Sequence, residues 1–182
     1  MILFINACVR KESRTNLIAN RLFSKLDQPV AEVRLSDIEF PTTDEDFLKT
    51  RDRLINEKRF DDKLFSLAKQ FADADEVVIA APFWDLSFPA SLKQYFEQIN
   101  VLGITFQYTS DGIPQGLCKA GKLTYITTAG GNFFPEEYGF GYVKALAQNF
   151  YGIKDVRLIK ATGLDIYGAN VEKILQEAFE QI

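Results

Sequence analysis

The segment ILFINACVRKESRTNLIANRLFSKL (residues 2–26) joins two patterns that belong to different kinds of secondary structure. It starts with a short apolar run without alternation, which is typical of a strand in a sheet covered on both faces. From Thr15 onward, leucine and isoleucine recur every three or four residues, as they do on one face of an amphipathic helix. A strand followed by a short loop and a helix is the opening unit of an α/β fold.

Similar units follow along the rest of the chain. Further strands are predicted at residues 31–35, 76–82, 123–129 and 156–163, and helices at 15–26, 44–74 (as two helices), 90–100, 135–151 and 170–182. This order predicts an α/β doubly wound sheet of five parallel strands in the order 2-1-3-4-5, with helices on both faces. The chain contains no linker or repeat, so residues 1–182 are expected to form a single domain.

The composition excludes several classes of function. A formal net charge of -4 without a basic face argues against a nucleic-acid partner. The absence of histidine removes Ser-His-Asp and Cys-His catalysis and every His-ligated metal site, and we expect no metal. The N-terminus has no basic region, and no apolar run reaches the roughly 20 residues that a membrane span needs. We therefore expect a cytoplasmic protein without a membrane contact.

Ligands of such sheets bind beyond the carboxyl ends of the strands, where the strand order reverses. Loops 8–15, 82–89 and 128–134 are predicted to meet there. In the first loop, Ser13, Arg14 and Thr15 stand where a helix begins. The two hydroxyl groups are ordinary helix caps, or they help the free N–H groups of the helix to hold a phosphate.

The same loop has a second interpretation. Cys8, Arg14 and Thr15 have the C-x5-R-[S/T] spacing by which a cysteine phosphatase or arsenate reductase holds an anion over a thiolate. Low-molecular-weight tyrosine phosphatases take their general acid from an Asp-Pro pair, which this chain lacks. A cysteine at a strand end is also more often buried and inert. The phosphatase remains an alternative hypothesis.

The second and third loops favour a flat ligand. Phe83, Trp84 and Phe88 follow the third strand without helical periodicity, and they form either the top of the core or a wall beside a planar heterocycle. Gly130 and Gly131 follow the fourth strand, where glycine allows backbone N–H groups to approach a ligand closely.

The stretch IAAPFWDLSFPASLKQYFEQINVLGITFQYT (residues 79–109) resembles consecutive motifs of the FMN-dependent NAD(P)H:quinone oxidoreductases and azoreductases. The Gly-Leu…Gly-Lys pattern within 116–122 and the TTAGG of 127–131 extend the resemblance over most of the chain. It implies a flavodoxin-like domain with bound FMN and with NADH or NADPH as cosubstrate. A quinone, azo or nitroaromatic acceptor would take the hydride in a ping-pong cycle.

The resemblance also implies which residues contact the cofactor, while the flavin itself carries the hydride. They are Ser13, Arg14, Thr15, Pro82, Phe83, Trp84, Asp85, Leu86, Thr128, Ala129, Gly130 and Gly131. This chain departs from family habit at Asp85, usually Asn, at Ala129, often Arg, and in the first loop, where Cys8 or Arg10 replaces a frequent Ser.

Relatives of this kind are homodimers with active sites at the subunit interface. We therefore expect a homodimer in which segments 41–60 and 103–121 are candidates for the second wall of the site. Phe106, Tyr108 and Phe133 are predicted to contact the aromatic substrate or to form interface core. A non-enzymatic electron carrier of the flavodoxin type is the other alternative.

Overall fold

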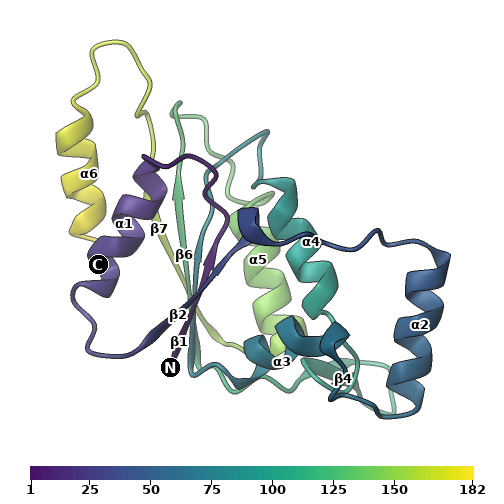
Figure 1. Cartoon of the computed structure of the whole chain (residues 1–182). Coiled ribbons are helices and arrows are strands. Elements are labelled where there is room, and N and C mark those ends of the chain that lie inside the picture. The colour runs from purple at the N-terminus through teal and green to yellow at the C-terminus, as the bar shows by residue number, and fades with distance from the viewer.

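Five parallel strands of the computed structural model, which describes residues 1–182, form one sheet in the order β2-β1-β3-β6-β7 (Figure 1). The strands are β1 (Ile2–Asn6), β2 (Val30–Arg34), β3 (Glu76–Ala80), β6 (Lys122–Thr128) and β7 (Asp155–Ala161). Numbered among the main strands alone, this order is the predicted 2-1-3-4-5 of a flavodoxin-like fold, so the predicted fold is confirmed.

Helices cover both faces of the sheet, as expected (Figure 1). The helices α1 (Arg14–Phe23) and α6 (Val171–Phe179) lie on one face, and α3 (Ser66–Asp73), α4 (Ala90–Ile99) and α5 (Phe140–Leu146) on the other. In β1, Leu3 and Ile5 pack toward the second group, whereas Ile2 and Phe4 pack toward the first. Because both faces are buried, the strand is apolar at successive positions.

Three segments differ in detail from the predicted elements. The charged stretch 44–74 forms α2 (Glu45–Asn56) and α3, as expected, with the short 3-10 turn Lys63–Phe65 before α3. The helix predicted at 135–151 begins only at Phe140 and ends in the π-helical turn Ala147–Tyr151. A second 3-10 turn, Leu35–Asp37, follows β2.

The long connection 103–121 contains a small antiparallel hairpin of β4 (Phe106–Tyr108) and β5 (Pro114–Gly116). The hairpin lies at the end of the sheet where the main strands begin (Figure 1). Gly116 lets it dock there, because a Cβ at this position would collide with the backbone of Tyr151 and Gly152. Three-residue strands give too short a pattern for sequence periodicity to detect.

The helix α2 stands away from the rest of the molecule (Figure 1). Asp44 caps it by accepting a hydrogen bond from the N–H of Phe47, and Leu54 is its one fully buried residue. No helix combines the length and hydrophobicity that crossing a bilayer requires.

A strained turn follows β3 at residues 84–87. Trp84 and Ser87 exchange two backbone hydrogen bonds, with N···O distances of 3.1 and 2.7 Å. The two residues between them, Asp85 and Leu86, both have positive φ, at 49° and 69°. Two consecutive left-handed residues are typical of a type I′ turn, which normally contains Asn and Gly. A leucine with its Cβ in this conformation costs about 1 kcal/mol or more.

Replacing Leu86 with glycine should therefore be better tolerated than replacing it with alanine. Both variants lose the same side chain, but alanine keeps the strained Cβ. We expect Leu86→Gly to be about 1 kcal/mol more stable than Leu86→Ala in chemical denaturation. Equal midpoints for the two variants would show that the turn carries no such strain.

Candidate functional site

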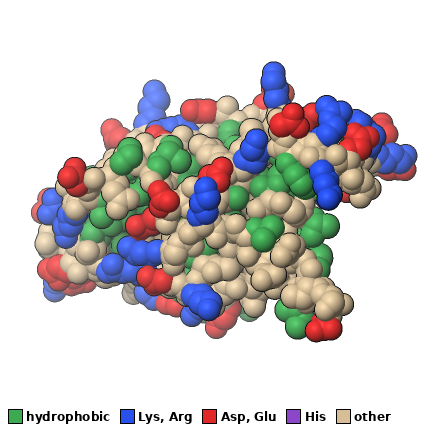
Figure 2. Space-filling view, turned by 90° about the horizontal axis from the view of Figure 1, so that it is seen from below, with side chains coloured by type: hydrophobic (Ala, Val, Ile, Leu, Met, Phe, Trp, Pro, Cys, Tyr) green, Lys and Arg blue, Asp and Glu red, His purple; other side chains and the backbone are tan.

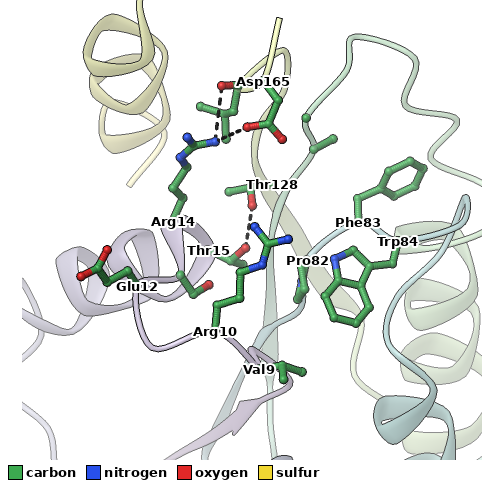
Figure 3. A pocket seen from close by; sticks show the side chains of 14 residues that line it. Val9, Arg10, Glu12, Arg14, Thr15, Pro82, Phe83, Trp84, Thr128 and Asp165 are labelled. Atoms are coloured by element: carbon green, nitrogen blue, oxygen red, sulfur yellow. Dashed lines mark hydrogen bonds and ion pairs between the residues drawn. The ribbon is translucent and has the colours of Figure 1, made fainter.

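A cavity of about 270 Å³ opens beyond the carboxyl ends of β1, β3 and β6 (Figure 3). Most residues predicted to contact the cofactor line it, namely Ser13, Arg14, Thr15, Pro82, Phe83, Trp84, Thr128, Ala129 and Gly130. The remaining three, Asp85, Leu86 and Gly131, lie beside these in the chain but do not line the cavity. The three predicted loops therefore meet at one place.

Five further residues line the cavity: Val9, Arg10, Glu12, Leu164 and Asp165. The first three belong to the predicted loop after β1. A basic residue such as Arg10 in a loop predicted to hold a phosphate is a sequence feature that points to the site. Leu164 and Asp165 come from the loop after β7. No sequence pattern marks them, because an aspartate in a connecting loop is ordinary.

The buried side chain of Asn6 organises the first loop. Its Oδ1 accepts a hydrogen bond from the N–H of Cys8 at 2.9 Å. Its Nδ2 donates to Glu32 Oε1 of β2 at 2.7 Å and to Asn16 Oδ1 of α1 at 3.3 Å. One amide thus ties the last residue of β1 to the loop, the neighbouring strand and the following helix, which fixes where α1 begins.

The first turn of α1 presents free donors to the cavity. Ser13 is the N-cap, and its Oγ accepts the N–H of Asn16 at 3.2 Å. The N–H groups of Arg14 and Thr15 have no acceptor within the protein. The first turn also contains no acidic residue that would neutralise the positive end of the helix dipole. Such a terminus is suited to an anion.

Cys8 does not take part in this arrangement. It is 4% exposed, it packs in the core between the sheet and α1, and it does not line the cavity. Its Sγ lies 3.7 Å from the carbonyl oxygen of Ala80, to which the thiol donates. Burial raises the pKa of the Cys8 thiol, and the nearby Ser13, Arg34 and Thr15 side chains oppose this rise only in part. The structure therefore does not provide the exposed thiolate that the phosphatase hypothesis needs.

The loop after β3 supplies aromatic walls. The N–H of Phe83 donates to the carbonyl oxygen of Thr128 at 2.9 Å, which holds this loop against the end of β6. The Phe83 ring packs on Phe134 with centroids 4.6 Å apart. Trp84 remains 40% exposed beside the cavity (Figure 3). Phe88 instead packs on Phe96 and Tyr142, so it closes the core, and only the other two rings flank the cavity.

The loop after β6 has free backbone N–H groups and packs closely against the loop after β7. The carbonyl groups of residues 129–131 accept hydrogen bonds from Gly163, Leu164 and Asp165, whereas the N–H groups of Gly130 and Gly131 have no acceptor in the protein. A Cβ on Gly130 would lie 2.5 Å from Asp165 Oδ2. Neither glycine has a positive φ, so at Gly130 the close contact with Asp165, rather than the backbone conformation, favours glycine.

A hydrogen bond joins the first and third loops. Thr15 is 1% exposed, and its Oγ1 lies 2.7 Å from Oγ1 of Thr128 (Figure 3). Arg14 donates to Asp165 Oδ1 at 2.7 Å and to the carbonyl oxygen of Leu164 at 3.3 Å. The helix terminus is thus fastened to the ends of both β6 and β7.

The residues predicted to contact substrate lie outside this cavity. Phe106 is 7% exposed and packs on Tyr108 and Phe150 in the hairpin region, at the opposite end of the sheet. Tyr108 is 52% exposed. Phe133 lies in the loop after β6 and is 76% exposed without lining the cavity. Within one chain Phe106 and Tyr108 pack on each other, whereas Phe133 lies in a different loop.

Comparison with known proteins shows what the chain resembles. Residues 1–182 match a family described by its flavodoxin-like fold. An FMN-dependent NADH:quinone oxidoreductase of Clostridium perfringens is 36% identical over 99% of this chain and 94% of its own length. The enzyme of that name from Clostridium beijerinckii is also 36% identical, with the same coverage.

Solved structures agree in fold. An FMN-dependent NADH-azoreductase from Bacillus anthracis, in complex with FMN, is 25% identical with a TM-score of 0.82, covering 99% of this chain and 94% of that chain. An NAD(P)H:quinone oxidoreductase from Methanothermobacter marburgensis, at 15% identity and a TM-score of 0.67, covers 98% of this chain and 95% of that chain and shows the fold alone. The chain belongs to the flavodoxin-like fold family, among the FMN-dependent NADH:quinone oxidoreductases and azoreductases.

Proposed function

We propose that residues 1–182 act as one FMN-binding domain of an oxidoreductase that transfers hydride from NADH to quinones and to azo or nitroaromatic compounds. The cavity at the three strand ends carries this assignment, because it combines an anion-binding helix terminus with aromatic walls and free backbone donors. When bound, FMN supplies the hydride chemistry, so the protein needs no histidine or other acid–base residue.

At one end of the cavity, the chain is suited to the phosphate of the cofactor. The free N–H groups of Arg14 and Thr15 lie at the N-terminus of α1, which is the positive end of the helix dipole. Ser13 and Thr15 hold this turn through the cap and through the bond to Thr128. These donors are already in position, so binding requires little reorganisation of the backbone.

At the other end, the chain is suited to the flat ring. Pro82, Phe83 and Trp84 form an apolar wall, while Gly130 in the cavity lining and Gly131 next to it in the chain have N–H groups without an acceptor in the protein. These groups would stabilise negative charge that develops on the ring during reduction. Asp85 takes the left-handed conformation that the usual Asn also adopts readily, so the turn is kept despite the different side chain.

Binding can be measured through Trp84, the only tryptophan in the chain. Because it lines the cavity and is 40% exposed, FMN bound there should quench most of its fluorescence. We expect saturable quenching when FMN is added to flavin-free protein, and the holoprotein should be bleached by NADH and recoloured by a quinone. Trp84→Phe should lose the fluorescence signal and still turn yellow.

Tryptophan emission that stays unchanged at saturating FMN would contradict the proposed site. A protein that binds FMN but does not oxidise NADH with small quinones would point to the electron-carrier alternative.

We also propose a homodimer in which the partner's hairpin completes the substrate site. Tyr108 and the cavity lie at opposite ends of the sheet, so Tyr108 can reach a substrate only from another copy. Exposed apolar side chains accompany it at Leu102, Ile113 and Leu117. Figure 2, which looks from below, shows hydrophobic side chains on the right-hand part of this face beside a highly charged lobe. Such exposed groups are common where chains associate.

The dimer makes a specific kinetic prediction. Sedimentation equilibrium should give twice the 20.7 kDa mass of the chain. Tyr108→Ala should lower turnover with quinone at least several-fold without changing FMN affinity, because Tyr108 is far from the cavity of its own chain. Gln107→Ala is the matched control on the same strand and should leave turnover unchanged. A monomeric mass together with unaffected Tyr108→Ala kinetics would contradict the proposal.

The buried state of Cys8 predicts the absence of phosphatase activity. Since its thiol has a raised pKa and donates to Ala80, it should not attack an aryl phosphate at neutral pH. We expect no phosphate release by the wild type, and unchanged NADH oxidation in Cys8→Ala. Aryl phosphate hydrolysis that disappears in Cys8→Ala would restore the phosphatase hypothesis.

A further inference from the structure

Two arginines line the same end of the cavity, but they are held very differently. Arg14 is paired with Asp165 through a 2.7 Å contact and also donates to the carbonyl oxygen of Leu164. Arg10 makes no ion pair and no hydrogen bond. Figure 3 shows the difference: the Arg10 side chain extends from its loop into the cavity, and Arg14 reaches toward Asp165.

The Arg14–Asp165 pair belongs to a larger attachment between loops. Residues 163–165 donate three backbone hydrogen bonds to the carbonyl groups of residues 129–131, at 2.9 to 3.2 Å. The other carboxylate oxygen, Asp165 Oδ2, lies so close to Gly130 that a Cβ there would force the Asp165 side chain to move. The pair therefore joins α1 to a loop that three backbone hydrogen bonds hold against residues 129–131, of which Gly130 lines the cavity.

Charge balance distinguishes the two residues further. The carboxylate of Asp165 neutralises Arg14, and a phosphate would have to compete with it for the guanidinium group. Glu12 also lines the cavity, but in Figure 3 its carboxylate points away from Arg10. Arg10 is thus the unpaired cation at this end of the cavity, and its five N–H donors suit the geometry of a phosphate.

We propose a division of labour that rests on the proposed FMN site. Arg10 binds the terminal phosphate of the flavin, and Arg14 is a positioning residue that holds the 163–165 segment against Gly130 through Asp165. The backbone N–H groups of α1 then bind the phosphate together with Arg10. The Arg14 side chain, which sequence resemblance assigns to the phosphate, acts instead on the placement of the loop beside the ring.

Riboflavin, which lacks the phosphate, separates the two roles. The ratio of the dissociation constants for riboflavin and FMN measures what the phosphate contributes to binding. Arg10→Ala should weaken FMN binding about tenfold or more, because it removes a charged hydrogen-bond donor to the phosphate. It should leave riboflavin binding unchanged, since riboflavin has no phosphate. Arg14→Ala should weaken both flavins by the same factor, so its ratio stays that of the wild type.

Variants of the ion pair test the positioning role. Asp165→Asn breaks the same contact from its other side and should weaken riboflavin binding as much as Arg14→Ala does. The double variant should be no weaker than either single variant, since both remove one interaction. Arg14→Lys, which keeps the charge, should restore part of the riboflavin affinity. Lys11→Ala is the control for general charge, because Lys11 is exposed in the same loop and does not line the cavity.

The division of labour is overturned if Arg14→Ala abolishes the preference for FMN over riboflavin while Arg10→Ala keeps it. It is equally overturned if Arg10→Ala changes only the KM for NADH, which would place Arg10 at the cosubstrate. Failure of the proposed function looks different, because the wild type itself would then bind neither flavin.

Discussion

Parallel hydrogen bonding between β1, β3 and β6 is the constraint on which the functional site depends. In this register Asn6 pairs with Ala80, and Ala80 with Ile126, so the three strands end almost level. Every strand of a parallel sheet has its carboxyl end at the same edge. The loops after these strands therefore leave the sheet side by side, and each delivers a different group to one cavity: helix donors, aromatic rings and glycine N–H groups.

A few polar side chains at the carboxyl edge of the sheet make several of the hydrogen bonds that connect its loops. Asn6 joins three elements, and the Thr15–Thr128 bond joins α1 to β6. Side chains that are satisfied within the protein position the loops, which leaves the backbone N–H groups of Arg14, Thr15, Gly130 and Gly131 free. A cofactor that accepts hydrogen bonds at both ends would supply acceptors for these donors, which have no partner within the protein.

Near the cavity, some residues adopt backbone conformations that their residue type disfavours. Asp85 and Leu86 adopt left-handed backbone conformations that leucine avoids, immediately after the wall of aromatic residues. Gly130 has no positive φ, and glycine is favoured there because the Asp165 carboxylate occupies the space beside it. Strain and close packing of this kind tend to gather at functional sites, where the surrounding structure can hold them in place.

Local patterns in the sequence predicted the five main strands and the three loops that meet at the cavity, and general rules for parallel sheets added the strand order. The set of residues that contact the cofactor came from the resemblance to the oxidoreductase family. Apolar runs and helical periodicity depend on neighbours only a few positions away, and so does the start of α1 at Ser13, Arg14 and Thr15. Only the tertiary structure revealed the hairpin β4–β5, the buried position of Cys8, the distance of Tyr108 from the cavity of its own chain, and the contact between Arg14 and Asp165. That contact joins residues 151 positions apart. Nothing in the local pattern around either residue encodes it, because it arises only when the sheet places the ends of β1 and β7 at the same edge.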